Sequence, residues 1–556
     1  MADTPAQAQQ AGHMSTEIAT KKDEVSTVLN ELDESKDLSR ESSEPADSDG
    51  RPEASLTWKI VAILLVSAIG FGAHWSSGIT GAMKSTLKKE LHINNTQFAL
   101  LEASEDFMVT ALILFSGLVT DRIGGAGNYF PYQESLERAL VVPGWLTGLV
   151  GAIMYGNVIY SLGSILIAAA AQVRSYRFMI AGRIIAAFGD IATQVAQYKI
   201  FSSWFPPSSG FASTLGLELG IGKIGSFVGK SSANVIAKNT GNFAWVFWVA
   251  VFMNLFTNFM TVVFYQFNKI ATKRFASVSD PATGEKLTEK NKKFEIKKVL
   301  ELPWIFWCIM IFSFFQTSTA IVFTQNATEL VEQRFGTDSV TAGWYSSTVQ
   351  YAGFFLVPII GIFIDLFGNR VSLMVLCGTG TFLAMALVAY SNTTSGNAAA
   401  FGIFAFAYTF GPTVIIDGIR TSMWNQSVFG SAYAVKIAMN NSVNIIIRVV
   451  TGVIQDRDNN SYDKVSIFYS AWAAASAAVS IVLVILSLRS IDLRRLQWTR
   501  KQRIAKGAII NERNRRFHDE EGEKNRRISK MCFGSLIVLI LGAWSAYFWG
   551  VATGNN

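Results

Sequence analysis

Charged and amide side chains recur inside stretches of the chain that are otherwise apolar. The segment 177–203 carries four of them: Arg183, Asp190, Gln194 and Gln197. Their steps of seven, four and three residues place all four on one face of an α-helix. Because an ionisable group in an apolar helix is costly in free energy, it is a functional candidate by default. This polar face should line a wet cavity; alternatively, Arg183 and Asp190 pair with each other or with a neighbouring residue and only tie helices together.

The segment 210–236 carries a second set of charges. Lys223, Ser226 and Lys230 share a helix face, and Glu218 precedes them on the same segment. Glu218 fits two roles, a proton carrier or a structural partner of Lys223. Two pairs of glycines at four-residue spacing suit close helix packing: Gly216 with Gly220, and Gly225 with Gly229.

Carboxylates also gather in the segment 97–120, at Glu102, Glu105 and Asp106. They either titrate with pH, which makes Glu102 a candidate for proton coupling, or line a solvated vestibule. His74 fits a hydrogen-bonded packing residue as well as a pH sensor.

Two further groups lie in the second half of the chain. Asp417 and Arg420 are one helical turn apart, and we expect them to form a structural pair. A polar stripe at helical spacing crosses the segment 431–455, where it would line a cavity from the C-terminal side: Lys436, Asn440, Asn444 and Arg448.

No constellation in the sequence predicts catalysis. There is no phosphate-cradling Walker A loop, no metal-spaced histidine cluster and no nucleophile motif in a sensible context. The three cysteines each lie in an apolar run without CxxC spacing, which argues against a zinc site or a disulfide scaffold. The sequence therefore predicts a protein that is not an enzyme and that needs no cofactor or metal.

Composition points to the lipid bilayer. Half of the 556 residues (50%) are hydrophobic and only 16% are charged. The net charge of +7 comes from basic residues between apolar blocks, as the positive-inside rule predicts, rather than from a nucleic-acid surface. Apolar stretches long enough to span recur from Trp58 onward, in two sets of six. We expect these elements to position the charged residues around a shared cavity.

The spans divide the chain as follows. We expect a disordered cytosolic tail over 1–56, a six-helix bundle over 57–267, a cytosolic linker over 268–302, a second six-helix bundle over 303–490, a basic cytosolic segment over 491–530 and a thirteenth transmembrane helix over 531–551. The connection over 128–150 is long, and it is either a real insertion or a gene-model artefact.

The two sets of spans share an internal repeat. A G-x-x-x-D-x-x-G pattern follows the second span and recurs after the eighth. Its positions are Gly117, Asp121 and Gly124 in the first copy, and Gly361, Asp365 and Gly368 in the second. A carboxylate at such a place can meet a neighbouring helix N-terminus or an arginine, in contacts that form and break as two halves rock.

This loop resembles the signature of the major facilitator superfamily, in which such loops belong to the cytosolic gate. The resemblance implies an all-α membrane fold of two six-helix bundles and a transporter driven by a solute gradient. It also implies gating roles for Asp121, Arg122, Asp365 and Arg370.

A second resemblance is more specific. Gly182-Arg183, Gly189-Asp190, Val195-Ala196-Gln197 and Trp204-Phe205, with Gly222-Lys223-Ile224-Gly225-Ser226, resemble the lysosomal dipeptide transporter branch of that superfamily. In that branch the acidic residue and the basic residue bind the two charged ends of a dipeptide. Carried over, these roles fall on Asp190 and Lys223. Asp stands where the branch usually has Glu, and Lys stands where it has Arg. Both charges are therefore kept, but each side chain extends a different distance from the backbone.

The resemblance implies export of dipeptides from a vacuole or lysosome to the cytosol, and an accessory glycosylated membrane subunit. The alternative is proton-coupled transport of another small nutrient or organic anion. With the N-terminus in the cytosol, four of the Asn-x-Ser/Thr sequons fall in loops on the far side, and a fifth falls on the cytosolic side. The four are Asn94, Asn326, Asn392 and Asn459, and the fifth is Asn425.

Overall fold

The computed structural model describes the unit formed by residues 53–556 apart from several gaps. The described residues are 52, 54–123, 149–208, 210–275, 280–283, 296–391, 393–519 and 521–554. The expected tail up to residue 51, residues 128–148 of the long connection, residues 276–279 and 284–295 of the linker and the sequon at Asn392 lie outside them. No strand occurs in the described part, so the fold is all-α.

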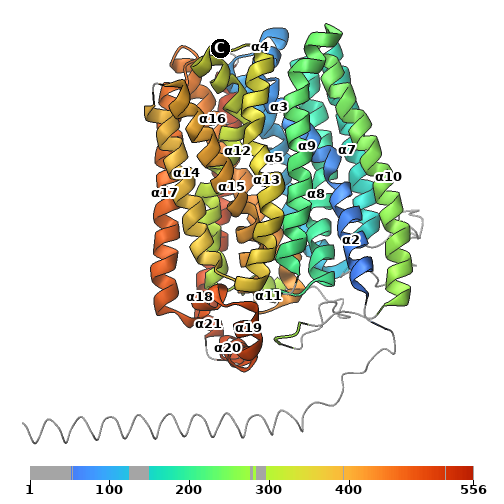
Figure 1. Cartoon of the computed structure of the whole chain (residues 1–556), viewed down its shortest axis with the longest axis vertical. Helices are drawn as coiled ribbons and strands as arrows, with labels where there is room; N and C mark the ends of the chain where they lie inside the picture. Colours follow the sequence, from blue (N-terminus) through green and yellow to red (C-terminus); the bar gives the residue numbers. More distant parts are fainter. Residues whose placement is uncertain are drawn as a thin grey trace, which may run out of the picture. The chain divides into compact units, whose positions relative to one another are not determined.

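The N-terminal half is a set of long helices that run side by side (Figure 1). Its helices are α2 (Leu56–Ile69), α3 (Phe71–Ala82), α4 (Lys84–Leu91), α5 (Asn95–Ile123), α7 (Leu149–Gln172), α8 (Tyr176–Trp204), α9 (Phe211–Thr240) and α10 (Ala244–Arg274). The first expected span is thus divided at Gly70 into α2 and α3.

The C-terminal half follows a short helix, α11 (Ile296–Val299). Its long helices are α12 (Trp304–Phe335), α13 (Ser339–Phe367), α14 (Arg370–Tyr390), α15 (Thr394–Ser422), α16 (Phe429–Arg457) and α17 (Asp463–Arg489), with the 3-10 turn η2 (Gln426–Val428) before α16.

The chain continues past α17 in a compact group of short helices. These are α18 (Ile491–Arg494), η3 (Arg495–Gln497), α19 (Arg500–Ala505) and α20 (Gly507–Asp519), and they lead into the long helix α21 (Gly522–Thr553). The end of the bundle that carries α18 to α20 lies at the bottom of Figure 1, and we call it the base; the opposite end is the top.

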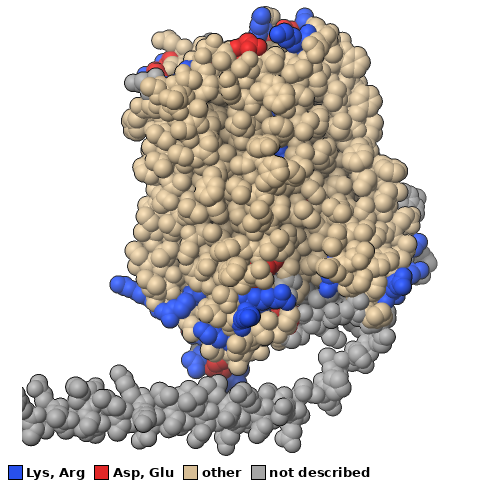
Figure 2. All heavy atoms as spheres, viewed as in Figure 1, with Lys and Arg blue, Asp and Glu red and all other residues tan. Residues whose placement is uncertain are grey.

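Eleven helical segments in the described part are long and apolar enough to cross a membrane, α21 among them. The expected thirteenth span over 531–551 lies within α21, which begins earlier in the chain than expected. In the view of Figure 2, nearly all charged residues lie at the two ends and the band between is almost uncharged. Large apolar side chains such as Phe252 and Phe259 are exposed on this band, as lipid-facing residues are.

Two long helices of the expected spans, α5 and α9, fall outside that apolar set. With 29 and 30 residues they have sufficient length, about 1.5 Å per residue. They are also the helices that carry the carboxylates of the segment 97–120 and the lysines of the segment 210–236. These charged residues would be costly on a lipid-facing surface, and they lie on two helices, α5 and α9, that can turn them toward the interior of the bundle.

The observed helices add detail to the expected organisation in three places. Helix α10 continues to Arg274, so the linker expected from residue 268 begins as helix. Helix α12 runs to Phe335, and Asn326 lies inside it rather than in a loop. The Asn326 side chain donates hydrogen bonds to Val322 O and Tyr469 Oη. The segment expected over 491–530 as a basic connection folds into α18 to α20 and the start of α21.

The two halves meet closely along α9 and α13, where glycines allow the backbones to touch. A Cβ on Gly216 would lie 2.7 Å from Val357 O, and a Cβ on Gly361 would lie 2.3 Å from Ala212 O. The other glycine pair of α9 packs within its own half, because a Cβ on Gly229 would lie 2.6 Å from Trp75 O. One pair of glycines thus serves the contact between halves and the other serves the N-terminal half.

Candidate functional site

A cavity of about 410 Å³ lies between the two halves and is lined by residues from both. It contains every substrate-binding and proton-coupling candidate of the sequence: Arg183, Asp190, Gln194, Gln197, Lys223, Glu218 and Glu102. The polar stripe of α16 faces it as well, through Lys436, Asn440, Asn444 and Arg448. The polar faces predicted from helical spacing therefore converge on one space.

Asp190 and Lys223 line this cavity near the middle of α8 and α9. Asp190 accepts a hydrogen bond from Gln194 Nε2, one helical turn away. The ammonium of Lys223 lies 3.8 Å from the ring centroid of Tyr408 on α15, a cation–π contact. In the described part of the chain, neither residue has an oppositely charged side chain within 4.0 Å.

Arg183 does not pair with Asp190. Its guanidinium donates to Glu102 Oε1 and to Glu105 Oε2, each at 2.9 Å, and also to Thr80 Oγ1. Two carboxylates of α5 thus engage this arginine of α8. Glu102 and Glu105 thus line the cavity while they form ion pairs with Arg183, and titration of these carboxylates stays a prediction.

Glu218 is buried and has polar neighbours other than Lys223. Tyr198 Oη donates to Glu218 Oε2 at 3.2 Å, and Gln197 Nε2 donates to Oε1 at 3.3 Å. His74 Nε2 lies 3.7 Å from the same Oε1. Of the two roles considered for Glu218, the structural pairing with Lys223 is not formed, and His74 faces this carboxylate instead.

Ion pairs join the halves on the top side of the cavity. The guanidinium of Arg448 on α16 donates to Asp106 on α5, and also to Gln325 Oε1 at 2.9 Å. Nearer the top, Glu329 on α12 lies 2.9 Å from the ammonium of Lys84 and 2.8 Å from that of Lys88. These contacts hold α12 and α16 against α4 and α5.

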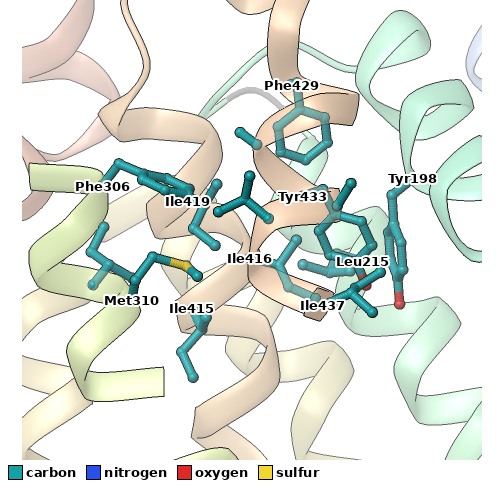
Figure 3. Packing of buried hydrophobic residues seen from close by; sticks show 14 of the residues in the cluster. Tyr198, Leu215, Phe306, Met310, Ile415, Ile416, Ile419, Phe429, Tyr433 and Ile437 are labelled. Atoms are coloured by element: carbon teal, nitrogen blue, oxygen red, sulfur yellow. The ribbon is translucent and has the colours of Figure 1, made fainter. Parts of the chain in front are cut away.

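Apolar packing joins the halves on the base side. The rings of Tyr198 and Tyr433 lie 4.6 Å apart between α8 and α16. Figure 3 shows Tyr198 and Leu215 of the N-terminal half beside Tyr433, Ile437 and their buried neighbours. Contacts between the halves thus lie on both sides of the cavity.

The second copy of the repeated motif lies at the base and bridges the halves. The backbone N–H of Ser213 donates to Asp365 Oδ2 at 2.7 Å and that of Ala212 donates to Oδ1 at 3.3 Å. A carboxylate of α13 therefore satisfies free N–H groups at the start of α9. Asp121 and Arg122 of the first copy lie at the end of α5, and their side chains are outside the described part.

Arg370 joins several elements at the base. It forms a fully buried ion pair with Asp417 and donates to Ser208 Oγ at 2.8 Å and Leu496 O at 3.3 Å. The expected pair of Asp417 with Arg420 is wrong, because Arg420 donates to Ser202 O instead. A partner on another helix is preferred here over the neighbour one turn away.

The sequence-based search missed Lys84, Glu329, Gln325 and Tyr408. Lys84 is the first residue of α4, and Glu329 lies in the last part of α12. Both positions fall just beyond the ends of the expected spans. The signal for Glu329 was present, because the apolar residues Ala327, Leu330 and Val331 continue the helical pattern. Tyr408 gives no signal by itself, since aromatic residues are common in apolar helices.

The fold and the enclosed polar cavity define a multi-pass membrane protein of the transporter class. The sequence pattern of the Major Facilitator Superfamily matches residues 64–454, and the chain belongs to this family. The solved structure of the family transporter FucP, in its outward conformation, covers 76% of this chain and 99% of its own, with a TM-score of 0.51 and 14% identity. That likeness concerns the fold alone.

Among curated proteins, the chain is similar to the lysosomal dipeptide transporter MFSD1. Identity is 21% over 464 residues with the protein of Bos taurus, covering 81% of this chain and 91% of the relative. It is 20% over 451 residues with that of Homo sapiens, covering 78% and 87%. It is 22% over 445 residues with that of Mus musculus, covering 77% and 87%.

Proposed function

We propose that this protein moves dipeptides across the membrane of a lysosome or vacuole into the cytosol by alternating access. The main support is that Asp190 and Lys223 line one cavity at mid-helix depth without an ion-pair partner in the described residues. A carboxylate can hold the ammonium end of a dipeptide, and a lysine its carboxylate end. The lysosomal dipeptide transporters similar to this chain support the same substrate class.

The cavity also offers polar side chains that can hydrogen-bond the peptide unit between the two termini of a dipeptide. Gln350 and Asn444 line the cavity, and each carries a side-chain amide with one acceptor oxygen and one donor NH2 group. Each can accept a bond from a peptide N–H. Arg183 contributes through its hold on α5 rather than as a free cation.

Uptake of labelled dipeptides into proteoliposomes tests this function. Asp190→Asn and Lys223→Gln should each abolish transport without loss of expression, because one end of the zwitterion then lacks its counter-charge. Asp190→Glu and Lys223→Arg should retain much of it. Asp463→Asn and Lys273→Gln, which remove exposed charges outside the cavity, serve as matched controls. Normal dipeptide transport by Lys223→Gln would refute the assignment.

A second candidate is proton-coupled transport, favoured by the contact between His74 and Glu218 beside the cavity. Counterflow and pH-driven uptake distinguish the two mechanisms. In a proton-coupled carrier, Glu218→Gln or Asp190→Asn should spare counterflow and abolish uphill uptake. In a facilitated carrier, a pH gradient should not drive accumulation in the unmodified protein.

We further propose that the base faces the cytosol. The basic residues of α18 to α20 and of the end of α10 lie at this end, in accord with the positive-inside rule. Asn94 and Asn459 lie in connections at the top, where the lumen would be. An accessory glycosylated subunit, if the resemblance extends to it, would meet the lumenal side.

A further inference from the structure

Besides Lys223, two further lysines line the cavity, Lys230 and Lys436, and the binding of a simple zwitterion uses neither. Lys436 projects from α16 and lines the cavity from the C-terminal half. Its ammonium lies 5.5 Å from the ring centroid of Tyr433. Within the described residues, no carboxylate lies within 4.0 Å of it.

The other charges around the cavity are already engaged. Arg183 pairs with two carboxylates of α5, and Arg448 pairs with Asp106. Lys230 donates to Thr324 O at 2.7 Å across the halves, and Glu218 contacts His74. Asp190, Lys223, Lys230 and Lys436 have no charged partner within 4.0 Å among the described residues; Lys230 is held by a backbone carbonyl, whereas Lys223 and Lys436 contact aromatic rings.

A dipeptide with an uncharged side chain would pair with Asp190 and Lys223 and leave Lys436 without a counter-charge. An ammonium in a protein cavity without a counter-ion nearby is costly in free energy, so an occupant that brings a second carboxylate to Lys436 is favoured. We propose, on the basis of the dipeptide function above, that Lys436 forms a subsite for an acidic side chain, and that the preferred substrates are dipeptides containing glutamate or aspartate.

The helix positions place this subsite at a suitable distance. Lys223 is twelve residues from the base end of α9, and Lys436 is seven residues from the base end of α16. The five-residue difference corresponds to about 8 Å along the bundle. An extended dipeptide spans about 7 Å, so an acidic side chain can reach toward the base while the termini bind Asp190 and Lys223.

The test compares Ala–Glu with Ala–Gln, which have nearly the same shape and differ by one charge, in proteoliposome uptake. The unmodified protein should favour Ala–Glu by about tenfold in kcat/KM, the effect of one favourable charge contact of about 1.4 kcal/mol. Lys436→Gln should bring this ratio close to one while Ala–Gln transport stays within about threefold. Lys436→Arg should keep the preference, and Lys273→Gln, at the exposed end of α10, should not alter it.

Thermal unfolding and dipeptide transport are measured on the same variants, so that a folding defect can be distinguished from a loss of function. Lys436→Gln should be at least as resistant to thermal unfolding as the unmodified protein, because it removes a charge that has no ion-pair partner. Equal transport of both dipeptides by the unmodified protein, or an equal loss of both in Lys436→Gln, would overturn the subsite and leave the dipeptide function standing. A chain that transports neither dipeptide would overturn the proposed function itself, and the subsite with it.

Discussion

At the scale of single residues, the site is organised by which charges are paired. The arginines on the top side of the cavity bind carboxylates of α5, while Asp190 accepts a hydrogen bond from Gln194 and Lys223 contacts the ring of Tyr408. Paired charges fix helices, and charges without an ionic partner are available to a solute. This division separates structural from substrate-binding candidates within one polar cavity.

The buried pair of Arg448 and Asp106 should stabilise this arrangement of the halves. Asp106→Asn or Arg448→Gln leaves one buried charge without its partner, which typically costs about 3–5 kcal/mol. We expect each single substitution to lower the melting temperature in detergent, and the double substitution to be less harmful than the two effects added. A double-mutant cycle measures this coupling.

The matched control is the ion pair of Arg334 and Asp463 near the top, whose aspartate is 70% exposed. Such a pair contributes about 0–1 kcal/mol, so Asp463→Asn should leave the melting temperature almost unchanged. Additive effects of Asp106→Asn and Arg448→Gln would mean that the two side chains do not stabilise one another.

At the scale of elements, α21 is an addition to the two six-helix halves that packs on both of them. Near the base, Trp307 of α12 donates to Ser529 Oγ at 3.2 Å. Toward the top, Trp544 donates to Thr110 Oγ1 on α5 at 3.0 Å, and Tyr547 stacks on Phe107. The helix therefore traverses the bundle from base to top.

This path predicts that the two chain termini lie on opposite sides of the membrane. In sealed vesicles oriented with the cytosolic side outward, protease should remove a tag placed before Met1 and spare a tag placed after Asn556. Detergent should then expose the second tag, which controls for intrinsic resistance. Cleavage of both tags in intact vesicles would show that α21 does not cross the membrane.

At the scale of the whole molecule, the structure has the halves in contact on both sides of the cavity. Opening toward the base must separate α9 from α13 and release the contact of Asp365 with the start of α9. The C-terminal segment adds to this end, because Arg503 of α19 binds both Asp280 and Pro207 O. Burial raises the pKa of Asp280, but the hydrogen bond and charge of Arg503 outweigh it and lower this pKa below its usual value.

Gly361→Val should disfavour closure of the base. Its Cβ would lie 2.3 Å from Ala212 O, a backbone atom that cannot move aside cheaply. We expect the variant to populate base-open states. A cysteine at Leu215, which is buried between the halves in this structure, should then react faster with a thiol reagent added from the base side, in a background without the native cysteines.

Gly402→Val is the matched control, because a Cβ at Gly402 of α15 meets nothing within 4 Å. It tests the same substitution in a transmembrane helix, at a position that makes no contact between the halves. Equal labelling of Leu215→Cys in both variants would contradict a role for close packing at Gly361.

The sequence by itself determined the membrane class, the positions of the long helices and the faces that carry charge. Apolar length fixes where helices can span, and a period of 3.6 residues fixes which side chains share a face. For this reason the polar stripes of α8, α9 and α16 could be assigned to a cavity before any helix was placed. The repeated glycine and aspartate motif likewise marked Asp365 for a contact at a helix end.

Only the tertiary structure decided which charges meet. Spacing along one helix made Arg183 with Asp190, and Asp417 with Arg420, plausible pairs. In the structure, Arg183 instead pairs with Glu102 and Glu105, and Asp417 pairs with Arg370. Periodicity gives the face of a helix but not the rotation and depth of the neighbour across from it. Ionic contacts depend on both, because the Coulomb energy falls with distance, and helix packing sets that distance.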